Sequence, residues 1–181
     1  MTKPKIATVW LDGCSGCHMS LLDIDEALIE VVRRADIVYG PLVDAQEFPE
    51  NVDVVLVEGA VSNMDDLKLV QKVRKRSKLL IALGDCAVTS NVPGMRNTIP
   101  TKRLLERAYV EGADVNHRAP TDGVPALLRH AVPVHEVVKV DLHLPGCPPR
   151  AEAIAYVVME LLDGRKPDLT GAQMAGKVKF G

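Results

Sequence analysis

Short apolar runs alternate with longer amphipathic segments along this chain of 181 residues. The runs are rich in Val, Ile and Leu and are closed by Gly, Pro or an acidic residue, which is typical of buried strands. The predicted strands are 6–11, 37–39, 52–57, 79–83 and 137–144. Helical spacing predicts helices over 19–34, from a cap at Ser62 or Asn63 to 77, over 102–111, over 126–130 and over 150–162.

This alternation predicts an α/β fold, because strands that alternate with helices form mostly parallel sheets covered on both faces. We expect a flavodoxin-like, open, mostly parallel five-stranded sheet with helices on both faces. Residues 1–165 form this domain, and residues 166–181 form a C-terminal tail that we expect to be mobile or docked on another chain. Trp10, inside the first run, is predicted to lie in the core.

The composition argues against binding to nucleic acid and against insertion in a membrane. The net charge of −2 offers no basic surface for nucleic acid. No apolar stretch approaches the roughly 18 residues of a membrane helix, and the first run is too short for a secretory signal. We therefore expect a cytoplasmic protein that binds neither nucleic acid nor membrane. In that reducing compartment, cysteine sets are more often metal-binding or catalytic than disulfide-bonded.

The cysteines of the chain directly follow three of the predicted strands. There are four of them, Cys14, Cys17, Cys86 and Cys147. Cys14 and Cys17 follow the first strand, Cys86 the fourth and Cys147 the fifth. Because ligands of open α/β sheets bind outside the carboxyl ends of the strands, we expect all four sulfurs to converge on one object.

Four thiolates suit a [4Fe–4S] cluster, which takes one from each cysteine. The separation of Cys86 and Cys147 favours this interpretation over a structural zinc site, which usually combines two close-spaced pairs. A thioredoxin-like redox pair at Cys14 and Cys17 leaves the other two cysteines without a role. Four independent core cysteines remain a further alternative.

Other residues at the same edge have more than one interpretation. His18 could ligate or hydrogen-bond a cluster, although a role in the first helical turn is favoured. Glu58 could be a subunit contact, a proton-handling carboxylate or a strand-end cap, while Asp12 and Asp85 are expected to form turns. FMN is not expected in this chain, because the loop after the first strand carries cysteines and Asp12 rather than a Ser/Thr-rich phosphate cradle.

Four motifs in order resemble the small subunit of [NiFe] hydrogenases, in particular the short small subunit of cytoplasmic NAD-reducing (bidirectional) enzymes. They are Cys-Ser-Gly-Cys-His-Met-Ser at 14–20, Val-Glu-Gly-Ala at 57–60, Gly-Asp-Cys-Ala at 84–87 and Leu-Pro-Gly-Cys-Pro-Pro-Arg at 144–150. The resemblance covers 8–162. It implies that Cys14, Cys17, Cys86 and Cys147 hold a proximal [4Fe–4S] cluster and that the nickel–iron centre lies in a separate large subunit.

Two departures from the family pattern stand out. This sequence has no cysteine after Cys147, so we expect one cluster rather than the further clusters of longer small subunits. A Gly-Gly pair often follows the third cysteine, and here Thr89-Ser90-Asn91 replaces it, which leaves the path of that loop open. The cluster subunit of respiratory complex I shares the Pro-Gly-Cys-Pro-Pro ending but typically has adjacent cysteines at the first position.

The expected function is electron transfer in a hydrogenase that catalyses H2 ⇌ 2 H+ + 2 e−, with hydrogen chemistry in the partner. The expected partners are the large subunit and iron–sulfur and flavin diaphorase subunits that reduce NAD. We expect two interfaces and an exposed apolar patch beside the cysteines. The alternatives are a complex I-like cluster subunit of a quinone- or ferredoxin-linked oxidoreductase and, in another class, a zinc-stabilised scaffold protein.

Overall fold

A five-stranded sheet in which all neighbouring strands are parallel forms the centre of the molecule, in the order β2-β1-β3-β5-β7. The computed structural model describes residues 2–171. The strands are β1 (Lys5–Trp10), β2 (Asp36–Tyr39), β3 (Val52–Glu58), β5 (Ser77–Leu83) and β7 (Leu142–Leu144). This order is that of flavodoxin, so the predicted fold class is confirmed.

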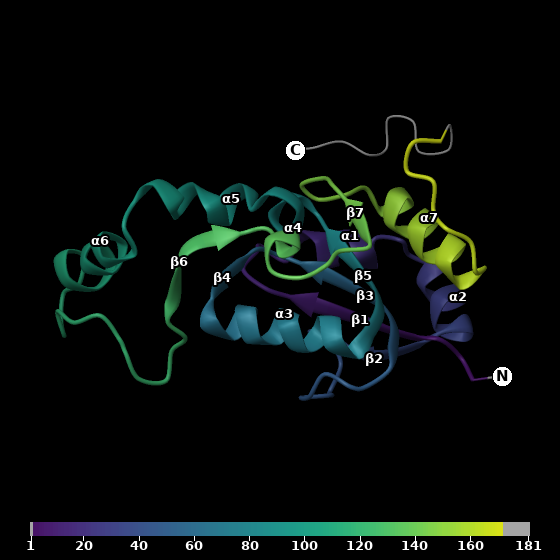
Figure 1. Cartoon of the computed structure of the whole chain (residues 1–181), viewed down its shortest axis with the longest axis horizontal. Coiled ribbons are helices and arrows are strands. Elements are labelled where there is room, and N and C mark those ends of the chain that lie inside the picture. Colours follow the sequence, from purple (N-terminus) through teal and green to yellow (C-terminus); the bar gives the residue numbers. More distant parts are fainter. Residues whose placement is uncertain (1, 172–181) are drawn as a thin grey trace.

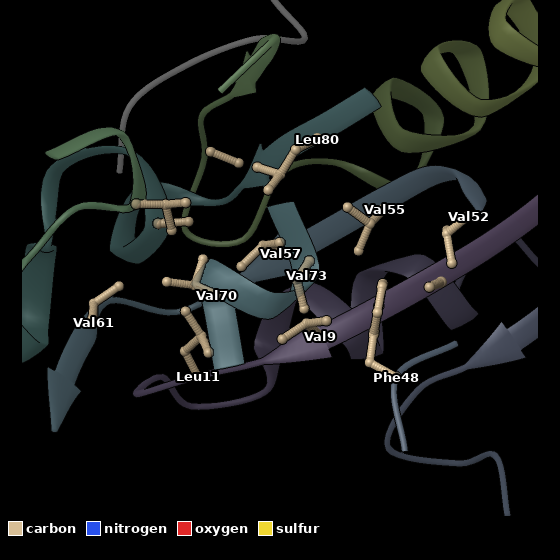
Figure 2. Close-up of a cluster of buried hydrophobic side chains, with 14 residues drawn as sticks. Val9, Leu11, Phe48, Val52, Val55, Val57, Val61, Val70, Val73 and Leu80 are labelled. Carbon is tan, nitrogen blue, oxygen red and sulfur yellow. The ribbon is translucent and has the colours of Figure 1, made fainter. Parts of the chain in front are cut away.

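Helices cover both faces of this sheet, as Figure 1 shows. One face carries α1 (Gly16–Leu22), α2 (Ala27–Arg34) and α7 (Ala151–Leu162), and the other carries α3 (Met64–Arg76). Successive residues of a strand point to opposite faces. In β3, Leu56 therefore packs with the α7 side, whereas Val55 and Val57 pack with the α3 side. Figure 2 shows the second of these clusters, in which eight of the 14 buried residues are valines.

A capping box begins α3. The Asn63 side chain accepts hydrogen bonds from the N–H groups of Asp65 and Asp66, and the Asp66 carboxylate accepts one from the Asn63 N–H. This reciprocal arrangement satisfies N–H groups that the first turn leaves without partners. The prediction of a cap at 62 or 63 is confirmed at Asn63.

The predicted continuous helix over 19–34 is wrong. The chain instead forms α1 and α2, with a turn between them. Asp25 in that turn has φ 52°, in the left-handed region that interrupts a right-handed helix. The apolar residues keep helical spacing across the break, which is why the pattern does not reveal it.

The segment between β5 and β7 differs most from the prediction. The expected short helix over 126–130 is wrong, because this segment forms β6 (Leu127–Val132), which pairs antiparallel with β4 (Val61–Asn63). Its helical pieces are α4 (Asp85–Thr89), α5 (Asn91–Gly94), η1 (Met95–Thr98), α6 (Thr101–Glu106), the π-helix η2 (Arg107–Glu111) and η3 (Val134–Glu136). The predicted helix over 102–111 corresponds to α6 and η2. In Figure 1, α6 lies away from the sheet at the far left.

Two further expectations need correction. The strand predicted over 137–144 is confined to β7, since 137–141 form a turn and irregular backbone and no strand. Trp10 is 49% exposed and not in the core, because it ends β1 and its indole N–H donates to the Gly13 carbonyl at 3.1 Å.

The predicted tail lies partly outside the described residues. Within them, Pro167 is buried and Leu169 packs against the cluster on the α7 side. The boundary at 165 and the state of 172–181 stay predictions. None of the helices within 2–171 combines the length and apolar character needed to cross a membrane.

Candidate metal centre

The carboxyl ends of four adjacent strands, β1, β3, β5 and β7, bring the candidate residues to one edge of the sheet. Cys14 lies in the loop after β1, and Cys17 in the first turn of α1. Cys86 lies in α4, directly after β5, and Cys147 lies in the loop between β7 and α7. The strand between β1 and β5 is β3, and its last residue is Glu58.

The four cysteines lie within electrostatic range of one another. Burial, then the charge of Glu58, and then the charges of the Cys86, Cys14 and Cys147 thiolates raise the pKa of the Cys17 thiol. Burial and the charges of Cys147, Cys14 and Glu58 also raise the pKa of Cys86, against a hydrogen bond from the Val92 backbone that lowers it. The predicted convergence is therefore present. That the cysteines hold a cluster stays a prediction.

Two glycines make the close approach of the loops possible. A Cβ on Gly84 would lie 2.2 Å from the Cys17 sulfur, so no other residue fits there without moving the cysteine. Gly84 also has φ +82°, which favours glycine. A Cβ on Gly16 would lie 3.2 Å from the Cys14 sulfur, whose Sγ accepts a hydrogen bond from the Gly16 N–H at 3.4 Å.

Hydrogen bonds join the three loops. The Asp85 N–H donates to the Gly146 carbonyl at 2.9 Å, and the Gly146 N–H donates to the Asp85 carboxylate at 2.6 Å. The Ser20 hydroxyl of α1 donates to the Pro149 carbonyl at 2.5 Å. Asp85 thus does more than form a turn, since it links the Cys86 and Cys147 loops. No motif in the sequence signals the role of Ser20.

The donor set consists of four thiols, which is the number that a [4Fe–4S] cluster takes. Within 2–171, no group of three or more His, Cys, Asp or Glu residues is arranged to hold one metal ion. Zinc requires four sulfurs about 2.3 Å from one point, whereas a cubane binds each thiolate at a different iron and so spaces the sulfurs more widely. Burial and the neighbouring negative charges raise the pKa values of Cys17 and Cys86, so a positively charged metal core would favour their thiolate forms.

Glu58 and His18 form a buried pair beside the cysteines. One oxygen of the Glu58 carboxylate accepts a hydrogen bond from the His18 N–H at 3.0 Å and contacts His18 Nδ1. Glu58 is 1% exposed. His18 Nε2 is buried and has no hydrogen-bond partner within the described part of the chain. The sequence-based interpretation of His18 as a first-turn residue agrees with this position.

The loop after Cys86 follows a glycine-type path without glycine. Ser90 has φ 67° and Asn91 has φ 26°, at the positions where the family often has Gly-Gly. This answers the question that the sequence leaves open about this loop. Ser90 is also buried, and its hydroxyl has no partner among residues 2–171.

Large apolar side chains next to the cysteine loops are exposed. Trp10 and Met19 flank the first loop and are 49% and 58% exposed. Val92 and Met95 follow the second loop and are 61% and 74% exposed. Exposed apolar surface around a site is typical of protein interfaces.

Comparison with known proteins places this arrangement in a family. The family model described as NADH ubiquinone oxidoreductase, 20 Kd subunit, matches residues 14–161, which include all four cysteines. The chain belongs to this family.

Relatives of this chain are named as subunits of hydrogenases. The chain is 40% identical over 167 residues to a vhu subunit of the F420-non-reducing hydrogenase of Methanocaldococcus jannaschii, covering 91% of this chain and 58% of that protein. It is 37% identical over 172 residues to the NAD-reducing hydrogenase HoxS subunit delta of Cupriavidus necator, covering 92% of this chain and 82% of that one. The chain spans 56 to 59% of the length of four archaeal relatives named as F420-non-reducing hydrogenase subunits.

A solved structure resembles this chain over nearly the whole length of the chain. A chain of an NAD+-reducing [NiFe]-hydrogenase in the H2-reduced state superposes with a TM-score of 0.93 and 36% identity, covering 99% of this chain and 100% of that one. The predicted resemblance to hydrogenase small subunits is confirmed.

Proposed function

We propose that this chain is the electron-transfer small subunit of a cytoplasmic [NiFe] hydrogenase complex. In this proposal Cys14, Cys17, Cys86 and Cys147 hold one proximal [4Fe–4S] cluster. The cluster relays electrons between the nickel–iron site of a large subunit and an NAD-reducing diaphorase module with iron–sulfur and flavin subunits. Hydrogen is split in the large subunit and not in this chain.

The observation that carries the proposal is the convergence of the four cysteines at one sheet edge. Their thiolates interact electrostatically, although up to 133 positions separate them in the sequence. The likeness to a chain of an NAD+-reducing [NiFe]-hydrogenase, with a TM-score of 0.93, supports the identity of the complex.

The cysteines differ in exposure in a way that suits a relay. Cys17 is buried and Cys86 is half-buried, whereas Cys14 and Cys147 are exposed. When bound, the cluster supplies one-electron transfer. The buried Cys17 would hold the cluster beside the sheet, and the exposed Cys14 and Cys147 would hold it near the protein surface. The exposed Met19, Val92 and Met95 beside them provide apolar surface for the large subunit.

A second candidate keeps the hydrogenase role but changes the electron acceptor. Four relatives named as subunits of F420-non-reducing hydrogenases are 38 to 41% identical to this chain. An acceptor other than NAD is therefore the main alternative for the outgoing electron.

The test is electron transfer in the assembled complex, with and without Cys147→Ser. We expect the complex to reduce NAD with hydrogen, and we expect the substitution to disrupt the cluster and abolish this reduction. The exchange of isotopes between D2 gas and water should persist in the variant, because this reaction needs only the large subunit. If NAD reduction continues at the original rate after the cluster is lost, the relay is wrong. If hydrogen reduces dyes but not NAD in the unmodified complex, the second candidate is favoured.

A further inference from the structure

Glu58 is the residue that β3 contributes to the edge where its neighbouring strands contribute cysteines. It pairs in register with Trp10, the last residue of β1. Its side chain is buried, and buried carboxylates are rare unless they are paired and hydrogen-bonded. The relay proposed above uses no carboxylate, so Glu58 needs a separate explanation.

The main chain of Glu58 holds the start of the first cysteine loop. Its carbonyl accepts a hydrogen bond from the Leu11 N–H at 2.8 Å, where the chain leaves β1. Gly59, with φ +94°, then turns the chain beneath this loop. A Cβ on Gly59 would lie 2.8 Å from the Leu11 backbone, so the two segments are in close contact.

The side chain of Glu58 holds the end of the same loop. Its carboxylate accepts the hydrogen bond of the His18 N–H at 3.0 Å. His18 is the third residue of α1, and its N–H is one that the N-cap side chain normally satisfies. Here the N-cap, Ser15, makes no side-chain hydrogen bond, and α1 has no acidic residue in its first turn. Glu58 therefore supplies from β3 the cap that α1 lacks.

We propose that Glu58 is a positioning residue that fixes the Cys14–Cys17 turn for cluster binding. Its main-chain carbonyl hydrogen-bonds Leu11, and its carboxylate hydrogen-bonds His18. Cys14 and Cys17 lie between these two points. The contact of the same carboxylate with His18 Nδ1 orients the imidazole, and the other oxygen lies 3.6 Å from where a Cβ on Gly13 would stand. A side chain that holds a ligand-bearing turn has the role of an outer-shell partner.

This inference rests on the proposed cluster and predicts which variants disturb it. The full chain is purified anaerobically with the subunits that accompany it. Iron, acid-labile sulfide, the EPR spectrum of the reduced protein and the rate of iron loss to a chelator are measured. Glu58→Ala removes the accepting oxygens, and Glu58→Gln keeps one. Asp66→Ala is the control, because Asp66 is likewise a carboxylate that accepts backbone hydrogen bonds at the start of a helix, but it caps α3 and not α1.

We expect Glu58→Ala to lose iron roughly tenfold faster than the unmodified chain, which is the lower range for outer-shell substitutions, and to show a changed EPR spectrum. Glu58→Gln should stay close to the unmodified chain in both. Asp66→Ala should lower the unfolding temperature but leave the EPR spectrum unchanged.

Three results overturn the positioning role. They are an unchanged cluster in Glu58→Ala, loss in Glu58→Gln as fast as in Glu58→Ala, and equal loss in Asp66→Ala. An unmodified chain without iron and sulfide contradicts the proposed function itself, so the two failures can be told apart.

Discussion

At the scale of single residues, Ser90 occupies a conformation that suits glycine. Its φ of 67° is left-handed, which costs a residue with a Cβ roughly 1–2 kcal/mol. Its buried hydroxyl also lacks a partner within residues 2–171. Ser90→Gly should therefore raise the free energy of unfolding by about 1 kcal/mol after the entropy cost of glycine.

Urea unfolding of the full chain checks this, with Asn51→Gly as the control. Asn51 has a similar φ of 57°, but Asn tolerates this region better than Ser. Its substitution should have a smaller effect. A loss of stability in Ser90→Gly would mean that the Ser90 hydroxyl makes a favourable contact.

Gly84 shows how a single atom decides the geometry of the candidate site. Gly84→Ala places a Cβ 2.2 Å from the Cys17 sulfur, so the cysteine must move. We expect the variant to lose most of its iron and sulfide. Gly164→Ala is the matched control, because Gly164 also has a positive φ of +72° but has no atom within 4 Å of the added carbon. Equal iron content in the two variants would show that the contact with Cys17 does not matter.

At the scale of elements, Arg74 and Asp141 connect the end of α3 to the strands it covers. The Arg74 guanidinium donates to the Asp141 carboxylate at 2.5 Å and to the Ser77 carbonyl at 2.6 Å. The Leu80 N–H donates to the same carboxylate at 2.9 Å. Burial alone would raise the pKa of Asp141, but these hydrogen bonds outweigh it and lower the pKa below 3.8.

This lowered pKa predicts a pH-dependent contribution to stability. In the unfolded chain Asp141 binds its proton more tightly, so its stabilisation is complete above pH 3.8 and is lost as the pH falls through the lower folded value. Asp141→Asn should cost about 1 kcal/mol at pH 7, a modest value because the pair is partly solvated. The cost should shrink as the pH falls below 3.8. Urea unfolding against pH measures it, and a cost that does not change with pH contradicts the linkage.

The same scale shows what the sequence could and could not reveal. Apolar runs located all five strands of the main sheet, because buried strands need continuous Val, Ile and Leu. The pattern failed at 126–130, where no residue is buried and no periodicity marks β6. It also missed the break at Asp25, because a single left-handed residue leaves the apolar spacing intact. The position of each cysteine directly after a predicted strand placed all four at one edge of the sheet, where the structure has them. The contacts of Glu58, Ser20 and Asp85 could not be predicted, because they depend on packing between segments that are distant in the sequence.

At the scale of the whole molecule, the cysteine edge combines a buried sulfur, exposed sulfurs and exposed apolar side chains. Such a surface suits a chain that works inside a complex, because an electron carrier needs its neighbour close and water excluded. We expect the isolated chain not to reduce dyes with hydrogen, since the proposal places the hydrogen-splitting site in the large subunit. Hydrogen-dependent dye reduction by this chain alone would contradict that division of labour.

The central claim is that Cys14, Cys17, Cys86 and Cys147 together hold one iron–sulfur cluster. The most direct measurement is the iron, acid-labile sulfide and zinc content of the anaerobically purified chain, combined with EPR of the reduced protein. We predict equal amounts of iron and sulfide in the ratio of one [4Fe–4S] cluster per chain, with a signal that each of the four Cys→Ser substitutions removes or changes. Zinc without sulfide, or a signal unaffected by any one of these substitutions, would contradict the account.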